Sequence, residues 1–250
     1  MRQRRRIKLT IDDLKVRRSK YFQLTVPYLH FLPGVVTCIV GANGSGKTTL
    51  VESIVGLIRP TQGRVIVSGY DTNKDIIQVK RSIGYIPDDE DWIIPELSAR
   101  EYFSLLISVQ DQTRLRVLNK RVVELADELM FSSFNQQLGD LSHGNIKKVQ
   151  IIAGLLHDPS FLVVDELSNG LDPIAIDRAE RLLRRKMYGG TCIIAATHDL
   201  YWAERFAKEI IMIAKGHVVL NDYTENIISR SGSLANRFME VYADVKQPAI

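Results

Sequence analysis

A glycine-rich segment containing one lysine and two threonines, GANGSGKTT at positions 41–49, could bind phosphate groups. It matches the pattern G-x-x-x-x-G-K-[ST], in which the glycines let backbone N–H groups curl around an anion. We expect Lys47 to reach the β- and γ-phosphates and the Thr48 hydroxyl to bind Mg²⁺. The residues predicted to contact the phosphate-bearing ligand are Gly41, Asn43, Gly44, Ser45, Gly46, Lys47, Thr48 and Thr49.

The segments on either side of this loop support the same chemistry. Residues 35–40 are apolar and largely β-branched, which predicts a buried strand. Residues 49–57 carry apolar side chains at helical spacing. A strand, a glycine loop and a helix in this order place the positive end of the helix dipole at the bound phosphates.

Two carboxylates and a histidine follow two further predicted strands. After Ser160, the four apolar residues 161–164 end at Asp165 and Glu166, and residues 191–197 form a run that ends at His198. The carboxyl end of a parallel strand is a usual place for a metal-binding acid, so we expect Asp165 and Thr48 to share Mg²⁺. Glu166 is then expected to orient and deprotonate an attacking water, while His198 bonds the γ-phosphate. Taken singly, each group could equally be a solvated strand end.

The segment LSHGN at positions 141–145 precedes an apolar stretch with helical spacing. Ser142 is a good N-cap residue, so the sequence predicts a capped amphipathic helix whose N-terminus could face an anion. Lys147 and Lys148 are expected on a face of this helix away from its apolar side chains.

The bulk composition excludes several classes of protein. With 250 residues, 45% hydrophobic and 25% charged, the chain is ordinary for a globular protein. Its longest apolar runs have strand length, well short of the ~18 residues that suggest a membrane span. Cys38 and Cys192 fall in predicted buried strands, which favours two core thiols in a reducing compartment over a disulfide. The basic N-terminus, with Arg2, Arg4, Arg5 and Arg6, is interpreted as a solvated tail, although such a cluster could also contact lipid or nucleic acid.

These motifs, in this order, resemble those of the ATP-binding-cassette (ABC) ATPases. The loop resembles the Walker A motif, FLVVDE at 161–166 the Walker B motif with its catalytic glutamate, and SNGLDP at 168–173 the D-loop. LSHGN resembles the family signature LSGGQ, and His198 the switch histidine. The resemblance covers about residues 7–227. It implies an α/β fold, with a P-loop NTPase core, an antiparallel β subdomain and an inserted helical subdomain.

The resemblance also implies a domain organisation. Residues 1–227 would form one nucleotide-binding domain, with a core at about 1–88 and 159–227 and a helical subdomain at about 89–158. A capping box at Ser98–Glu101 should begin one helix of that subdomain. Residues 228–250 would form a C-terminal helix and tail of unassigned role.

Membership of this family implies ATP and Mg²⁺ as ligands and a mechanism that needs two cassettes. Two identical or similar chains would pack head to tail, with Ser142 and Gly144 of one reaching the γ-phosphate held by the other. Opening and closing of the pair would drive a separate integral membrane permease. The chain would then be cytoplasmic, bound peripherally to the inner face of the cell membrane through that permease, with no nucleic acid partner expected.

The sequence departs from the family pattern at several positions. His143 stands where the signature has its first glycine, which should slow hydrolysis by limiting how closely the helix end approaches a phosphate. Asp88 stands where the family usually has glutamine, and we expect it to sense Mg²⁺ through a bridging water. Tyr21 is assigned as the aromatic residue that stacks on adenine, although Phe22 lies in the same region and both could instead be core residues.

The segment at 83–106 and the short C-terminal tail resemble cassettes of exporters of drugs, peptides and polysaccharides. Trp92, Ile93 and Ile94 are candidate contacts for the permease, or else they pack within their own subdomain. An import-system cassette, a soluble ATPase acting on a non-membrane partner and a nucleotide-gated switch with little turnover stay open as alternatives.

Overall fold

The computed structural model describes residues 8–110 and 112–246. The N-terminal arginines singled out above, residues 2 and 4–6, lie outside the described residues. Within the described part, ten strands form one sheet in the order β5-β4-β1-β2-β10-β9-β3-β8-β7-β6. The strands are β1 (Leu9–Arg17), β2 (Gln23–Phe31), β3 (Val36–Val40), β4 (Gln62–Val67), β5 (Tyr70–Asp71), β6 (Ile83–Ile86), β7 (Phe161–Asp165), β8 (Cys192–Thr197), β9 (Glu209–Ala214) and β10 (His217–Tyr223).

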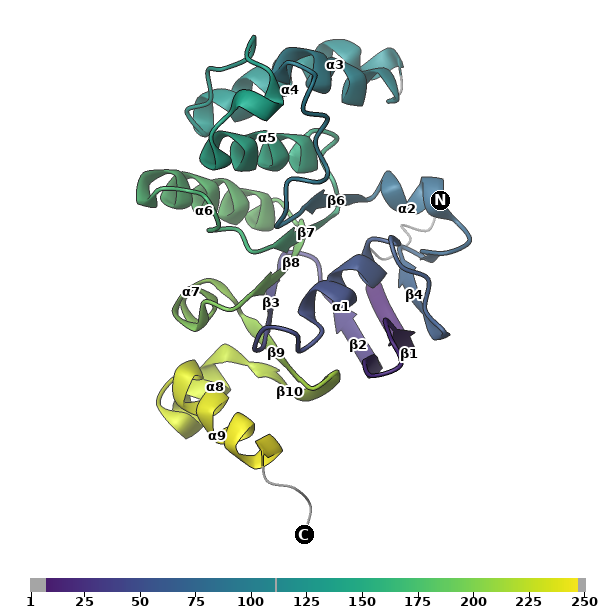
Figure 1. Ribbon diagram of the computed structural model, residues 1–250, viewed down its shortest axis with the longest axis vertical. Helices are drawn as coiled ribbons and strands as arrows, with labels where there is room; N and C mark the ends of the chain where they lie inside the picture. Colours follow the sequence, from purple (N-terminus) through teal and green to yellow (C-terminus); the bar gives the residue numbers. More distant parts are fainter. Residues whose placement is uncertain (1–7, 111, 247–250) are drawn as a thin grey trace.

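Helices cover this sheet and extend from it at two ends (Figure 1). They are α1 (Lys47–Ile54), α2 (Ile76–Lys80), α3 (Ala99–Ser108), α4 (Leu115–Glu128), α5 (His143–Leu155), α6 (Pro173–Tyr188), α7 (Leu200–Phe206), α8 (Thr224–Ser231) and α9 (Leu234–Lys246). Figure 1 shows α3, α4 and α5 gathered at one end and α8 and α9 at the opposite end.

The parallel part of the sheet aligns the ends of the strands that carry polar residues. Strands β3, β8, β7 and β6 run parallel, and each is buried on both faces, as continuous apolar runs require. Val40 at the end of β3 pairs with Thr197 at the end of β8. Asp165 at the end of β7 pairs with Ala196 on β8. The register therefore brings the residues that follow these strands to one edge of the sheet.

The antiparallel part of the sheet joins the parallel part through a narrow contact. Strands β1, β2, β4 and β5 pair antiparallel with one another, in the pairs β1–β2, β1–β4 and β4–β5. Strand β10 meets β2 at a single ladder position, where His217 pairs with Thr25. Most of the cohesion across this junction therefore has to come from side-chain packing.

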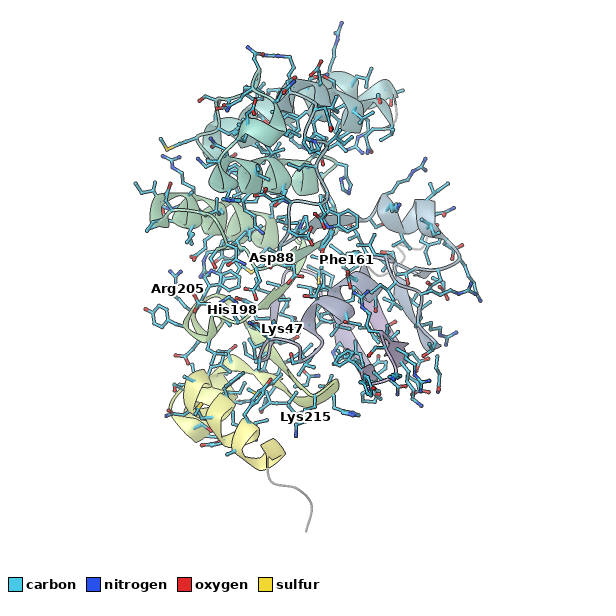
Figure 2. All side chains as sticks on the ribbon, in the orientation of Figure 1. Lys47, Asp88, Phe161, His198, Arg205 and Lys215 are labelled. Carbon is cyan, nitrogen blue, oxygen red and sulfur yellow. The ribbon has the colours of Figure 1, made fainter. Side chains whose placement is uncertain are left out.

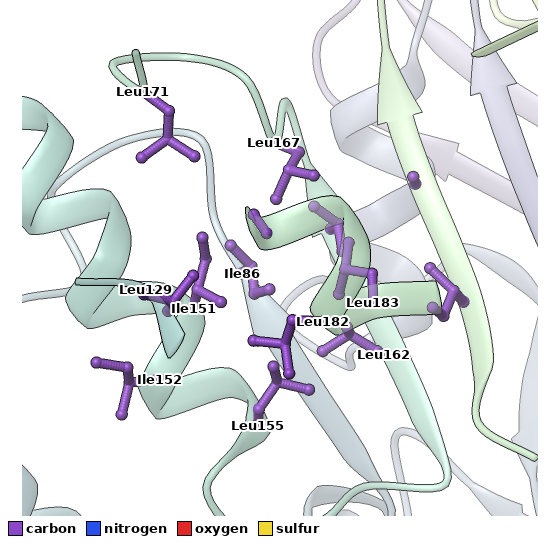
Figure 3. Packing of buried hydrophobic residues seen from close by; sticks show 14 of the residues in the cluster. Ile86, Leu129, Ile151, Ile152, Leu155, Leu162, Leu167, Leu171, Leu182 and Leu183 are labelled. Atoms are coloured by element: carbon purple, nitrogen blue, oxygen red, sulfur yellow. The ribbon is translucent and has the colours of Figure 1, made fainter. Parts of the chain in front are cut away.

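Two apolar clusters lie on the two faces of the sheet. One contains α1 together with side chains of both the antiparallel and the parallel strands. The other lies between the parallel strands and helices α3 to α7 (Figure 3). In this second cluster, side chains of α5 such as Ile151 and Leu155 pack with Leu182 of α6 and with Ile86 of β6. The buried area on each face anchors the helices whose N-termini carry the functional motifs.

The helical segment between β6 and β7 begins as the sequence predicts. Ser98 caps α3, and the Glu101 side chain bonds back to the Ser98 backbone, so the predicted capping box is confirmed. Helices α3, α4 and α5 all fall within residues 89–158. The division into a core and a helical subdomain stays a prediction. Cys38 and Cys192 are buried and free, as expected of core thiols.

Candidate functional site

The phosphate loop lies between the end of β3 and the start of α1, where the sequence places it. Gly44 and Gly46 have φ values of 75° and 115°, a region that favours glycine because it has no Cβ. The Gly41 backbone is packed so closely that a Cβ there would lie 2.4 Å from the Ser45 Oγ. The loop glycines are therefore needed for its conformation as well as for anion binding.

A cavity of about 600 Å³ opens beside this loop. It is lined by Phe22, Asn43, Gly44, Gly46, Lys47, Thr48, Thr49, Asp88 and Glu166. Figure 2 shows Lys47, Asp88 and His198 on neighbouring elements near the middle of the molecule. Residues far apart in the chain thus converge on one space large enough for a small ligand.

Lys47 is buried at the mouth of its own loop. Its Nζ donates hydrogen bonds to the Gly41 carbonyl at 2.9 Å and to the Ala42 carbonyl at 3.4 Å. Both acceptors are neutral backbone carbonyls. An anion in the cavity would be a stronger, charged partner for the ammonium and could replace them. This position agrees with the expected role of Lys47 in phosphate binding.

Asp165 and Thr48 lie close enough for the Thr48 hydroxyl to hydrogen-bond the carboxylate and lower its pKa. Burial has the larger effect and, with the neighbouring Asp88 and Glu166 carboxylates, raises the pKa of Asp165 to about 6. A bound cation would relieve this crowding of negative groups. Among residues 8–110 and 112–246, no cluster of three or more His, Cys, Asp or Glu side chains could hold a metal alone. The Thr48 hydroxyl and the Asp165 carboxylate are oxygen ligands of the kind that Mg²⁺ takes from a protein before phosphates and water complete its shell.

Glu166 is held by hydrogen bonds from the end of β8. Its Oε2 accepts from the Thr197 hydroxyl at 2.9 Å and from the His198 backbone N–H at 3.4 Å. Its Oε1 lies 2.9 Å from the His198 Nδ1. The Glu166 backbone has φ 46°, a left-handed conformation that is unfavourable for a residue with a Cβ. The strand end therefore fixes both the carboxylate and the strained backbone that presents it to the cavity. The sequence predicted Glu166 and His198 but missed Thr197, which reads as an ordinary strand residue.

Asp88 lines the cavity and is held from outside it. Its Oδ1 accepts a hydrogen bond from the Asn169 side-chain amide at 2.6 Å. Asn169 belongs to the SNGLDP segment, which leads to α6 through the Asp172 N-cap. This hydrogen bond links the SNGLDP segment to Asp88, the acid that follows β6 where the family usually has glutamine.

Lys147 corrects one expectation from the sequence. It was expected on the polar face of its helix, yet it is only 2% exposed. Its Nζ donates to the Pro87 carbonyl at 2.7 Å and to the Asp165 carbonyl at 3.1 Å. Burial lowers the pKa of Lys147 to about 8, although the carboxylates of Asp88, Asp165 and others oppose this shift. The helix is enclosed by neighbouring elements along most of its length, so its apolar periodicity does not identify a solvent-facing side.

The N-terminus of α5 does not line the cavity of its own chain. Ser142 caps the helix by accepting from the Asn145 N–H, as predicted. Gly144 packs against the SNGLDP segment, where a Cβ would lie 2.8 Å from the Gly170 carbonyl. His143 is 85% exposed and its Nδ1 pairs with Glu90. Ser142 and Gly144 are absent from the lining of the cavity at the phosphate loop.

Phe22, and not Tyr21, lines the cavity at the loop, and the assignment of the ring that stacks on adenine stays a prediction. Tyr21 is 85% exposed in the turn between β1 and β2, and the Lys20 ammonium lies over its ring. Ser19 accepts hydrogen bonds from the backbone N–H groups of both aromatic residues and so shapes this turn. A Cβ at Gly46 would lie 3.1 Å from the Phe22 ring, which therefore rests on the loop.

Sites built in this way define the P-loop nucleotide-binding ATPases, in which a sheet presents a phosphate loop and catalytic acids at the same edge of its parallel strands. Comparison with known proteins refines this class. The family model described as ABC transporter matches residues 26–169. The ABC transporter ATP-binding protein NatA of Bacillus subtilis (strain 168) is 30% identical over 214 residues, 82% of this chain and 85% of NatA. The phosphonates import ATP-binding protein PhnC of Trichormus variabilis is 30% identical over 212 residues, 79% of this chain and 84% of PhnC.

Solved structures show the same fold. The ATP-binding subunit of an ABC transporter superposes with a TM-score of 0.83 at 24% identity, covering 94% of this chain and 99% of that one. A dimeric, post-hydrolysis ATP-binding cassette bound to ADP and Pi superposes with a TM-score of 0.74 at 24% identity, covering 86% and 98%. The chain therefore belongs to the ABC transporter family. It is an ATP-binding subunit of such a transporter and an ATPase. In the described part of the chain, every helix is too short or too polar to cross a membrane.

Proposed function

We propose that this chain hydrolyses ATP at a site completed by a second cassette, and that it powers a separate membrane permease of the export type. The observation that carries the proposal is the convergence of Lys47, Thr48, Asp88 and Glu166 on one cavity. Cassettes of this family dimerise and act with membrane permeases.

Each residue of the cavity has a role in this proposal. Lys47 and the N–H groups of the loop bind the phosphates of ATP, and Phe22 offers an apolar face for the base. Thr48 and Asp165 would hold Mg²⁺, which supplies positive charge that offsets the phosphates in the transition state. Glu166 accepts a proton from the attacking water, and His198, bonded to Glu166 through Nδ1, keeps Nε2 available for the γ-phosphate.

The position of the α5 N-terminus supports the need for a second cassette. Ser142 and Gly144 lie outside the cavity of their own chain, while the N-terminal end of their helix is suited to bind an anion. In a head-to-tail pair, each helix would meet the nucleotide held by the other chain. ATP would then hold the pair together, and its hydrolysis would release it.

The dimer can be tested with Glu166→Gln and a matched loop variant. With ATP and Mg²⁺, Glu166→Gln should elute as a stable dimer in size-exclusion chromatography with light scattering, because it retains ATP without turning it over. Lys47→Ala should stay monomeric and fail to bind ATP. A Glu166→Gln protein with normal turnover would contradict the role of Glu166, and intact ATP affinity in Lys47→Ala would contradict the loop assignment.

A surface near the helical segment is proposed to receive the permease. A hollow of about 210 Å³ there is lined by aromatic and aliphatic side chains, including Tyr85, Trp92, Tyr102 and Leu106. Trp92 and Ile94 are partly exposed, whereas Ile93 packs against the core. Such an apolar hollow suits a short helix of a permease, whose movement would reach the cavity through Pro87, which lines the hollow and precedes Asp88.

The direction of transport has two candidates. The resemblance of residues 83–106 to exporter cassettes favours export, while the similarity to PhnC, named as an import protein, favours import. Affinity purification of Glu166→Gln from detergent-solubilised native membranes with Mg-ATP separates these. A multi-span membrane protein is expected, and its fold identifies the direction. Recovery of ribosomes or nucleic acid alone would favour a soluble ATPase instead.

A further inference from the structure

The last helix reaches the phosphate loop through one tyrosine. The Tyr242 hydroxyl, on α9, accepts a hydrogen bond from the Ala42 backbone N–H at 2.7 Å. The same hydroxyl donates to the Ile213 backbone carbonyl at 2.8 Å. A phenol has one proton to donate, so this pair of bonds fixes the direction of the hydroxyl. Tyr242 thereby connects the second residue of the loop to the end of β9.

The loop is braced from the same side at a second point. The Gly216 backbone N–H, in the turn between β9 and β10, donates to the Ser45 carbonyl at 2.9 Å. Ala42 and Ser45 flank the two residues at the tip of the loop, Asn43 and Gly44, which line the cavity. Tyr242 and Gly216 thus hold Ala42 and Ser45 in place, and the two residues between them line the cavity.

Helix α9 is itself held firmly in place. Leu234 at its start is fully buried, and its backbone N–H donates to the Glu204 carboxylate of α7 at 2.6 Å. The Phe238 ring stacks on the Tyr242 ring with centroids 4.3 Å apart. Because α7 begins just after His198, α9 spans from the helix behind that histidine to the phosphate loop.

We propose that Tyr242 is a positioning residue for the phosphate loop. Docking of α9 and binding of a nucleoside diphosphate or triphosphate then favour each other. The proposal rests on the proposed function of the loop in binding phosphates. If Tyr242 stabilises the loop conformation that binds the nucleotide, then by linkage the nucleotide stabilises the docked α9 to the same degree. Helix α9, which lies in the segment that the sequence left without a role, would then support the nucleotide site through Tyr242.

The test compares Tyr242→Phe with the matched control Tyr188→Phe. Tyr188 lies at the end of α6 with its side chain largely exposed, so removal of its hydroxyl disturbs no contact at the loop. The probe is ADP with Mg²⁺, because it occupies the loop without turnover, and its Kd is measured by isothermal titration calorimetry. Tyr242→Phe removes both hydrogen bonds of the hydroxyl, and loss of the one from the Ala42 N–H predicts about fivefold weaker binding, with Kd unchanged in the control.

The outcomes separate this proposal from the function it rests on. Equal Kd for the wild type and Tyr242→Phe would overturn the role of Tyr242 alone. Failure of the wild type to bind ADP would overturn the loop assignment and this proposal with it. A purely structural role would lower the thermal unfolding temperature of the variant without ADP and leave Kd unchanged, which counts against the proposal.

A second measurement uses the wild type alone, so it tests the proposal even if Tyr242→Phe fails to fold. In the wild type, ADP should slow amide hydrogen exchange in α9 and at Ala42. Exchange in α4, which packs on α3 and α5 at the opposite end of the molecule, provides the internal reference. Unchanged exchange in α9 on saturation with ADP would refute the coupling.

Discussion

Replacing Thr197 by valine removes one hydroxyl from beside the Glu166 carboxylate while keeping the side-chain shape. Thr197 is only 2% exposed, and its hydroxyl is one of two short contacts to that carboxylate, at 2.9 Å. After the change, Glu166 Oε2 keeps only the longer contact, 3.4 Å, to the His198 backbone. A hydrogen bond to a charged group contributes about 1.5–3 kcal/mol, and each ~1.4 kcal/mol changes a rate about tenfold. If that energy holds Glu166 in its working position, kcat should fall about tenfold to hundredfold.

The assay is steady-state ATP hydrolysis with kcat and KM determined separately. Thr197 is not among the residues that line the cavity, so the ATP affinity of Thr197→Val should stay unchanged. Thr197→Ser restores the hydroxyl and should recover kcat to within about threefold, because it again donates to the carboxylate. Equal kcat in the valine variant and the wild type, or equal losses in the valine and serine variants, would refute the reasoning.

Three further changes test other parts of the structure. A Cβ at Gly84 would lie 2.0 Å from the Gly154 carbonyl oxygen. Gly84→Ala should therefore lower the free energy of unfolding by about 1–3 kcal/mol in urea titrations. The control Gly189→Ala, at an ordinary φ, should change that free energy by less than ~1 kcal/mol. Equal effects would contradict the close packing of β6 on α5. Burial lowers the pKa of His157 below its ordinary 6.5, so the unfolded chain binds the proton first as the pH falls, and the stability present above pH 6.5 is lost below it. The unfolding free energy of the wild type should therefore drop more between pH 7.5 and 5.5 than that of His157→Gln, and parallel curves would exclude this cause. His143→Gly should raise ATP hydrolysis by opening the helix end to a phosphate, and unchanged or lower turnover would show that the side chain is no obstacle.

Sequence reasoning located the elements that depend on local patterns. The phosphate loop needs glycines, a lysine and a hydroxyl within nine residues, so its spacing alone predicts where β3 ends and α1 begins. Asp165, Glu166 and His198 follow continuous apolar runs, and parallel strands carry such residues to one edge of a sheet. The capping box at Ser98 is equally local.

The contacts that sequence reasoning missed join segments distant along the chain. Lys147 looks like a surface lysine until β6 and β7 are seen to place two backbone carbonyls over it. Thr197 has no signal of its own, because its role depends on the register between β7 and β8. Tyr242 meets Ala42 across 200 positions. Phe22 and Tyr21 are neighbours in sequence, and only the conformation of the turn decides which ring meets the loop.

The narrow junction between β2 and β10 leaves α1 to connect the two parts of the sheet. A single ladder position joins the two parts of the sheet, so the apolar cluster around α1 holds them together. Leu50 and Ile54 of α1 pack in this cluster with side chains from both parts. The first residue of α1 is Lys47, so this connecting helix begins at the phosphate loop. Any shift of α1 would therefore act on both parts of the sheet at once.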